Sequence, residues 1–138
     1  MKTVILNQPD RVGRWVAERT DGQWIEGRGF AFGLEEEGEL IAGVIFDSWN
    51  GASLCMHVAA KPGARWLTRD FIRVCFYYPF VQLRAKKILG LVGSGNTAAR
   101  RFDEHLGFVL EATLADAHPD GDLLVYSMTP EQCRWLKL

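Results

Sequence analysis

Residues 87–108 place the strongest constraint on what this chain can fold into. A short apolar run, Ile88–Val92, is bounded by lysine and glycine, and that length predicts a buried strand within residues 86–92. Asn96 follows a glycine-rich loop and can cap a helix by accepting a backbone N–H. Gly107 is placed to end that helix. Phe108 then begins another apolar run, so the stretch predicts a strand, a loop, a helix and a second strand.

The first half of the chain predicts a short helix and a set of antiparallel strands. The first strand is expected at residues 4–6, and Asp10 is the expected N-cap of the helix that follows. Gly38 supplies the positive φ of a charged hairpin turn. Asn50-Gly51 is a two-residue hairpin signal. The expected strands lie at residues 30–34, 40–49 and 52–59.

The middle and the end of the chain add one crossover and a final hairpin. Thr68 is the expected N-cap of an apolar helix that Pro79 kinks or ends. A strand, a helix and a strand without a hairpin imply a parallel, right-handed crossover. Strands at 108–117 and 123–128 flank a turn, and residues 130–138 are expected to form a short amphipathic helix.

These elements predict an α+β fold, arranged as a three-layer α/β structure. Its central sheet is mixed and mostly antiparallel, with one parallel β-α-β crossover and helices on both faces. A chain of 138 residues fits one domain, residues 1–138.

Composition excludes several classes of protein. The formal net charge is −1, which gives no indication of a nucleic-acid or membrane-surface partner. No apolar run approaches the roughly 20 residues of a membrane span, and the N-terminus is too short in apolar residues for a signal peptide. Three cysteines in apolar surroundings indicate reduced core thiols and a cytoplasmic protein. The three histidines lack ligand spacing, so no metal is expected.

The sequence pattern of residues 92–108 resembles the C-terminal half of the GCN5-related N-acetyltransferases. The order of elements along nearly the whole chain is also similar to that family. Some members, including ones that act on ribosomal proteins, share the appearance of residues 66–69 and 78–80. The residues that carry the resemblance are Val92, Asn96, Ala99, Leu106, Gly107 and Phe108.

The resemblance implies an acyl-CoA N-acyltransferase-like fold that binds acetyl-CoA as a co-substrate. In the family, acetyl-CoA lies in a wedge where the two central parallel strands splay, and its pyrophosphate sits on backbone N–H groups before the crossover helix. A helix N-terminus offers such groups and a positive dipole end. The cofactor-binding residues that the resemblance implies are Val58, Gly63, Ala64, Arg65, Trp66, Thr68, Arg69, Asn96 and Phe102.

The phosphate loop of this chain departs from the family motif Q/R-x-x-G-x-G/A. Counted from Val58, the motif positions fall on Gly63, Trp66 and Thr68, so larger residues replace both glycines. Backbone N–H groups of residues 64–68 can still meet an anion, with charge from Lys61, Arg65 or Arg69. The loop therefore leaves open whether acetyl-CoA binds well, weakly or not at all.

The catalytic residues also depart from the family, and the sequence assigns none. Many relatives place a proton-donating tyrosine seven residues after the motif asparagine, and here that position is Asp103. The positions of a base on the preceding strand are Ala52 and Leu54, which cannot take a proton. His57 is interpreted as a half-buried structural histidine rather than a base. His105 and His118 are interpreted as surface residues.

The leading hypothesis is an acetyl-CoA-dependent N-acetyltransferase whose acceptor is an amine of a small molecule or a protein. One alternative is a non-catalytic acyl-CoA-binding or regulatory domain on the same fold. Another is an interaction protein that no longer binds CoA. A homodimer is expected from the apolar surface of the crossover helix and of residues 133–138.

Overall fold

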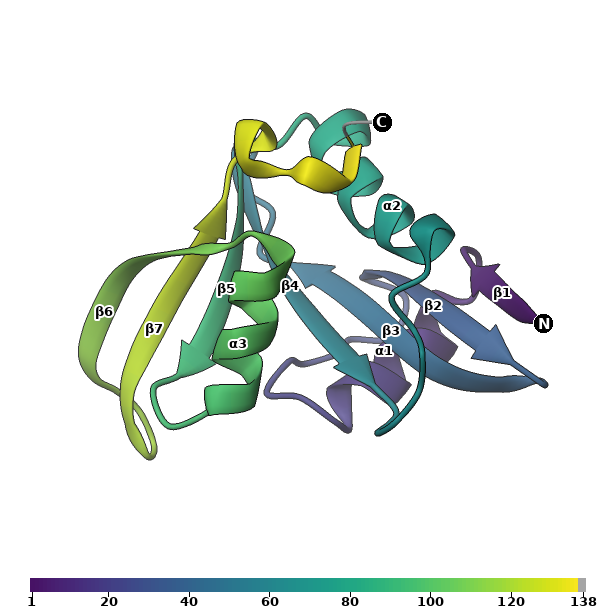
Figure 1. Cartoon of the computed structure of the whole chain (residues 1–138), viewed down its shortest axis with the longest axis horizontal. Coiled ribbons are helices and arrows are strands. Elements are labelled where there is room, and N and C mark those ends of the chain that lie inside the picture. The colour runs from purple at the N-terminus through teal and green to yellow at the C-terminus, as the bar shows by residue number, and fades with distance from the viewer. Residues whose placement is uncertain (137–138) are drawn as a thin grey trace.

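One mixed sheet forms the centre of the computed structural model, which describes residues 1–136 (Figure 1). Its strand order is β1-β2-β3-β4-β5-β7-β6. Among the pairs of neighbouring strands, only β4 and β5 are parallel. The strands are β1 (Lys2–Ile5), β2 (Phe30–Glu36), β3 (Glu39–Asp47), β4 (Ser53–Ala60), β5 (Lys87–Gly93), β6 (Val109–His118) and β7 (Gly121–Met128).

Helices cover both faces of this sheet, as the sequence predicts. Helix α1 packs on one face, where Val12 and Val16 are fully buried against Ala31, Ile45 and Ala59. The other two helices pack on the opposite face. The helices are α1 (Pro9–Ala17), α2 (Arg69–Tyr77) and α3 (Thr97–Leu106).

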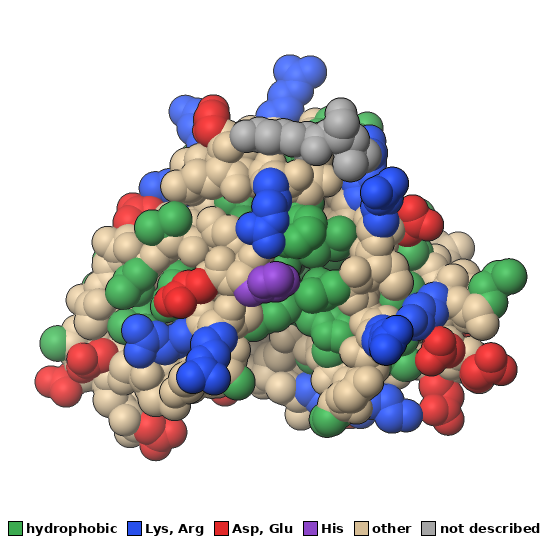
Figure 2. Space-filling view, in the orientation of Figure 1, with side chains coloured by type: hydrophobic (Ala, Val, Ile, Leu, Met, Phe, Trp, Pro, Cys, Tyr) green, Lys and Arg blue, Asp and Glu red, His purple; other side chains and the backbone are tan. Residues whose placement is uncertain are grey.

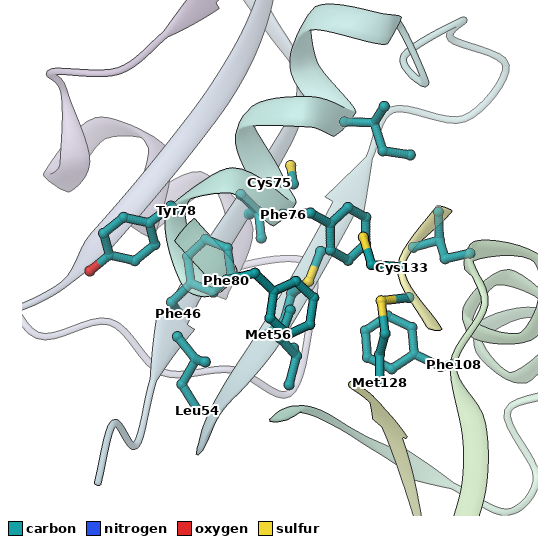
Figure 3. Close-up of a cluster of buried hydrophobic side chains, with 14 of the residues drawn as sticks. Phe46, Leu54, Met56, Cys75, Phe76, Tyr78, Phe80, Phe108, Met128 and Cys133 are labelled. Atoms are coloured by element: carbon teal, nitrogen blue, oxygen red, sulfur yellow. The ribbon is translucent and has the colours of Figure 1, made fainter. Parts of the chain in front are cut away.

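The larger core lies between the sheet and the α2 side. Figure 3 shows Phe76, Phe80 and Phe108 gathered with Met56 and Met128. The ring centroid of Phe76 lies 6.5 Å from that of Phe80 and 6.4 Å from that of Phe108. Because the cluster includes Met56 of β4 and Met128 of β7, this core joins α2 to strands on both sides of the parallel pair.

The parallel pair stays together over only a short length. Residues 53–55 pair with residues 87–89, although β4 runs on to Ala60 and β5 to Gly93. Figure 1 shows the two strands diverging toward their C-terminal ends, with α3 in front of β5. Paired strands lie only about 4.8 Å apart, so the end of the pairing opens a wedge in the sheet.

The predicted caps are confirmed. The Thr68 side chain accepts a hydrogen bond from the Phe71 N–H at 3.2 Å, and the Asn96 side chain accepts one from the Ala99 N–H at 3.1 Å. Gly107 ends α3 in the left-handed region, with φ of 110°. Pro79 ends α2 as expected, because α2 stops at Tyr77 and a π-helical turn follows at Tyr78–Gln82.

The N-terminal expectations need correction. The first strand is Lys2–Ile5 rather than residues 4–6. Asp10 is not the N-cap of α1, because Gln8 holds that position and Pro9 is the first helical residue. The Asp10 carboxylate accepts hydrogen bonds from the Trp24 indole and the Gly27 N–H, at 2.9 and 3.0 Å. It therefore anchors the glycine-rich connection across the start of the helix.

Two other local expectations are also wrong. The strand predicted at 40–49 ends at Asp47, and five residues, not a two-residue turn, connect it to β4. The Asn50 side chain accepts hydrogen bonds from the N–H groups of Ala52 and Ser53 and so closes this longer loop itself. The expected helix at 130–138 is replaced by two 3₁₀ turns, Pro130–Gln132 and Arg134–Leu136. Residues 137–138 lie outside the described part of the chain.

The three cysteines, Cys55, Cys75 and Cys133, are buried in the core, as expected. Within residues 1–136, no helix combines the length and the apolar composition that a membrane span needs.

Close packing of α1 on the sheet generates a first prediction. A Cβ added at Gly43 would lie 2.6 Å from Val16 Cγ2 and 3.0 Å from Val12 Cγ1. Because both valines are fully buried, we expect Gly43→Ala to lower the free energy of unfolding by about 1–3 kcal/mol. Urea unfolding measures this change. Gly95→Ala is the control, since a Cβ there meets open space. Equal stabilities of the two variants would contradict close packing at Gly43.

Candidate functional site

A cavity of about 920 Å³ opens where β4 and β5 separate. Its volume falls in the range of small-molecule sites. Successive side chains of a strand point to opposite faces of a sheet. Met56 and Val58 therefore face α2 and α3, whereas His57 faces the α1 side. Since all three line the cavity, it reaches both faces of the sheet.

The side of the cavity that faces α3 is mostly apolar. Trp66 closes it at one edge, with its ring centroid 5.2 Å from that of Phe102 and 6.2 Å from that of Phe71. Figure 2 shows hydrophobic side chains in the hollow beside α3, with Lys and Arg side chains around it. The apolar lining residues are Met56, Val58, Trp66, Ala99, Phe102, Leu106 and Phe108. This side suits a narrow, largely apolar ligand chain with an anionic end.

The opposite end of the cavity is polar. It is formed by the segment after α1, by β4 and by the β6–β7 turn, which the fold brings together. The lining residues there are Arg19, Thr20, Asp21, His57, His118, Pro119 and Asp120. The cavity thus has an apolar arm and a polar mouth with several titratable groups.

Asp103 is the titratable group on the α3 side. Burial, and secondarily the negative charge of Glu104, raise the pKa of Asp103 to about 7. The residue lines the cavity, and a Cβ added at Gly90 would lie 3.0 Å from its Oδ2 atom. The glycine on β5 therefore leaves room for this carboxyl in the wedge. A carboxyl with a pKa near neutrality can both give and take a proton under ordinary conditions.

His57 lies within hydrogen-bond distance of Asp47 of β3 on the polar side. The Nε2 atom of His57 lies 3.0 Å from Asp47 Oδ2. Partial burial alone would raise the pKa of Asp47. The hydrogen bond and the charge of His57, with the Ser48 hydroxyl, outweigh burial and hold that pKa below its usual value. The side chain of His57 is half-buried, as expected. Its ring forms part of the cavity wall.

His118 is not the surface residue that the sequence analysis expects. Its side chain is only 21% exposed and lines the cavity. The Nδ1 atom accepts a hydrogen bond from the Asp120 N–H at 3.2 Å, and Nε2 lies 3.7 Å from Asp21 Oδ2. The ring also fills the space above Gly93, where an added Cβ would lie 2.7 Å from Nε2. His105, by contrast, is exposed on α3 as expected.

The structure brings four of the nine expected cofactor residues into this cavity. They are Val58, Trp66, Asn96 and Phe102. Ala64, Arg65 and Thr68 lie together with Trp66 in a shallower hollow of about 320 Å³, beside Lys2. Gly63 and Arg69 are outside both sets of lining residues.

Two of the backbone donors expected to meet an anion are engaged within the chain. The Ala64 N–H donates to the Lys61 carbonyl at 3.1 Å, and the Thr68 N–H donates to the Trp66 carbonyl at 2.8 Å. The first N–H groups of α2, at Arg69 and Asp70, have no intrahelical acceptor because of their position. An anion at this end would therefore meet the start of α2 and the side chains of Arg65 and Arg69 more than the loop backbone.

Sequence reasoning did not assign a role to Asp103, Asp47 or His118. For Asp103 the signal was its place seven residues after Asn96, at the position of the family's tyrosine. The pairing of His57 with Asp47 depends on the register of β3 and β4, in which Asp47 lies opposite Cys55. No local pattern marks His118, which enters the cavity only because β6 and β7 fold back beside β5.

Solved structures of acetyltransferases share this fold. Mutant forms of the spermidine/spermine N-acetyltransferase SpeG from Vibrio cholerae match with a TM-score of 0.74 and 17% identity, over 96% of each chain. A probable acetyltransferase matches with a TM-score of 0.68 and 17% identity, over 95% of this chain and 94% of that one. A GNAT-family acetyltransferase from Bacillus anthracis gives 0.61 and 16%, over 73% and 66%. No protein-family model matches the sequence, and no curated protein does.

The raised pKa of Asp103 predicts a pH-dependent stability. Below the ordinary aspartate pKa near 4 the carboxyl is protonated in both folded and unfolded chains. Between about pH 4 and pH 7 the unfolded chain releases that proton while the folded chain keeps it, so stability falls as the pH rises. Asp103→Asn removes this loss. We expect the variant to gain about 1–3 kcal/mol relative to wild type near pH 8, and far less near pH 4.

Urea unfolding at the two pH values measures this gain. The control is Asp70→Asn, which changes an exposed aspartate in the first turn of α2. A gain for Asp103→Asn that is the same near pH 4 and pH 8 would contradict a raised pKa at this site.

Proposed function

We propose that this chain is an N-acetyltransferase of the GCN5-related family, which transfers an acetyl group from acetyl-CoA to an amine. The observation that carries the proposal is the wedge between β4 and β5, where the parallel pairing stops after three residue pairs and a cavity passes through the sheet. The shared fold with solved acetyltransferases supports it. The acceptor is an amine of a small molecule or a protein.

The residues of the wedge fit the parts of acetyl-CoA. Val58 and Phe102 supply apolar walls for the pantetheine arm. The backbone groups of β4 and β5 beyond the paired segment have no partner across the wedge, so they can pair with the amides of that arm. Arg65, Arg69 and the N-terminus of α2 supply positive charge for the phosphates. When bound, acetyl-CoA supplies an activated thioester.

Asp103 is the proton donor in this proposal. The neutral amine nitrogen forms a bond to the thioester carbon, the carbon–sulfur bond breaks, and the sulfur leaves as a thiolate. The nitrogen loses one proton as the amide forms, and this proton replaces the one that Asp103 gives to the sulfur. A thiol ordinarily has a pKa near 8.5, so a carboxyl with a pKa of about 7 can protonate the departing sulfur. Asp103 thus takes the part that a tyrosine plays at this position in many relatives.

A non-catalytic acyl-CoA-binding or regulatory domain is the second candidate. The observation that favours it is the phosphate loop, where Trp66 and Thr68 stand at the family's glycine positions. The Thr68 N–H donates to the Trp66 carbonyl of the same loop.

An interaction protein without CoA binding is the third candidate. The expected homodimer and cytoplasmic location stay predictions. Tyr77 and Val81, at the end of α2 and in its following turn, are among the exposed apolar side chains.

Binding of acetyl-CoA is the first test of the proposed function. A ligand at about 100 times its Kd stabilises a protein by roughly 2.7 kcal/mol, which raises the Tm of a domain of this size by several degrees. We expect that rise with acetyl-CoA, measured by thermal unfolding. Arg65→Ala and Arg69→Ala should each weaken binding by about 0.5–1.5 kcal/mol. The absence of any rise with acetyl-CoA, CoA or a longer acyl-CoA would exclude both the enzyme and the acyl-CoA-binding domain.

Turnover separates the enzyme from the binding domain. Release of the CoA thiol would be followed with a panel of amines that includes spermidine, the acceptor named for structurally similar proteins. Asp103→Asn should lower kcat by about 10²–10⁴ while acetyl-CoA binding is kept. Asp103→Tyr should restore part of the rate, because it returns a proton donor to the wedge. Equal kcat in wild type and Asp103→Asn would remove Asp103 from the mechanism.

A further inference from the structure

The polar mouth of the cavity carries an imidazole with one engaged and one available nitrogen. Asp47 is ionised near neutrality because its pKa is lowered. An ionised carboxylate only accepts hydrogen bonds, so Nε2 of His57, 3.0 Å from Asp47 Oδ2, carries the proton. When the ring is neutral, its lone pair is therefore on Nδ1. Within residues 1–136, Nδ1 of His57 accepts no hydrogen bond from another group.

His118, the other imidazole of the cavity, is placed differently. Its Nδ1 lone pair already accepts the Asp120 N–H at 3.2 Å, and its Nε2 faces Asp21. A proton acceptor must have its lone pair unoccupied. Of the two histidines, His57 is therefore the one whose ring can accept a proton without losing a hydrogen bond.

The position of His57 also suits the acceptor side of the reaction. The residue follows Met56 and precedes Val58 on β4, and those neighbours face the apolar side of the wedge. Asp103 and His57 thus lie on opposite faces of the sheet at one cavity. A group that protonates the leaving sulfur and a group that deprotonates the incoming amine need this kind of separation, since one must give a proton while the other takes one.

We propose that His57, oriented by Asp47, is the general base that deprotonates the acceptor amine. This inference rests on the proposed function. An alkylamine, like a lysine side chain, carries an extra proton near pH 7 and cannot attack until it loses it. His57 Nδ1 takes that proton from the ammonium nitrogen, whose freed lone pair attacks the thioester carbon. The ring becomes an imidazolium that Asp47 stabilises, and it later releases the proton to water. Asp47 is a positioning residue.

Other titratable and charged groups line the cavity or lie close to His57 and contribute to the pH dependence of the reaction. They come from the segment after α1, from β3 and β4, from α3 and from the β6–β7 turn. Arg19, Asp21, Asp103, His118 and Asp120 line the cavity. Asp47 is bonded to His57, and the Cys55 thiol lies near Asp47. The test must therefore separate His57 from these neighbours by more than a change in the pH profile.

Two amines of the same size provide that separation. n-Propylamine is protonated near pH 7, whereas 2,2,2-trifluoroethylamine is largely neutral because fluorine withdraws electrons. Thiol release from acetyl-CoA would be measured with each amine, for the full chain and for its His57→Gln variant. We expect His57→Gln to lower kcat/KM for n-propylamine by about 10²–10⁴-fold. The loss should be much smaller for trifluoroethylamine. Asp47→Asn should act in the same direction by a smaller factor.

The control is His105→Gln, which removes an exposed histidine outside the cavity. This variant should leave kcat/KM unchanged for both amines. Acetyl-CoA should bind every variant as tightly as it binds wild type, which shows that each variant folds. An equal loss for the two amines in His57→Gln, or no loss, overturns the base assignment. So does a wild-type chain that binds acetyl-CoA and acetylates neither amine. A wild-type chain that binds no acetyl-CoA removes the proposed function itself.

Discussion

The early end of the pairing between β4 and β5 is the constraint on which the site depends. Each strand keeps its outer partner far beyond the point where the inner pairing stops. β4 pairs with β3 out to Ala60, and β5 pairs with β7 out to Gly93. The outer ladders therefore hold β4 and β5 in place on the two sides of the gap. Backbone groups along the gap need partners when they are buried, so the fold itself prepares a place for a ligand rich in amides.

The alternation of side chains along a strand then gives the two faces of the sheet different chemical groups. On the α3 side the wedge is apolar, and the carboxyl of Asp103 has a pKa raised by burial. On the α1 side the ring of His57 is held by an ionised Asp47. The α3 side thus favours the protonated form of Asp103. The α1 side favours the ionised form of Asp47. Acid and base chemistry can thus take place at one cavity without the two groups neutralising each other.

Sequence reasoning reached the fold because its signals are local. The caps at Thr68 and Asn96, the stop at Gly107 and the break at Pro79 depend on residues within one helical turn, and all four are confirmed. It failed where a side chain chose a distant partner. Asp10 looks like a cap in the sequence but bonds to Trp24 and Gly27. His118 looks exposed until β6 and β7 fold against β5. Catalytic pairs are of this second kind, since they join residues from different strands.

Trp66 stands where the motif Q/R-x-x-G-x-G/A has a glycine. It limits the access of an anion to the backbone and makes packing contacts instead. A glycine there would let the chain approach an anion closely, whereas Trp66 instead packs its ring between Phe71 at the start of α2 and Phe102 in the middle of α3. The ring therefore links these two helices and closes the apolar arm of the cavity at one edge. In the proposed function, binding of the phosphates would therefore depend more on the side chains of Arg65 and Arg69, which are exposed. Exposed charges are screened by salt whereas buried ones are screened much less, so the phosphate end of this site is the part whose strength follows the ionic strength of the medium.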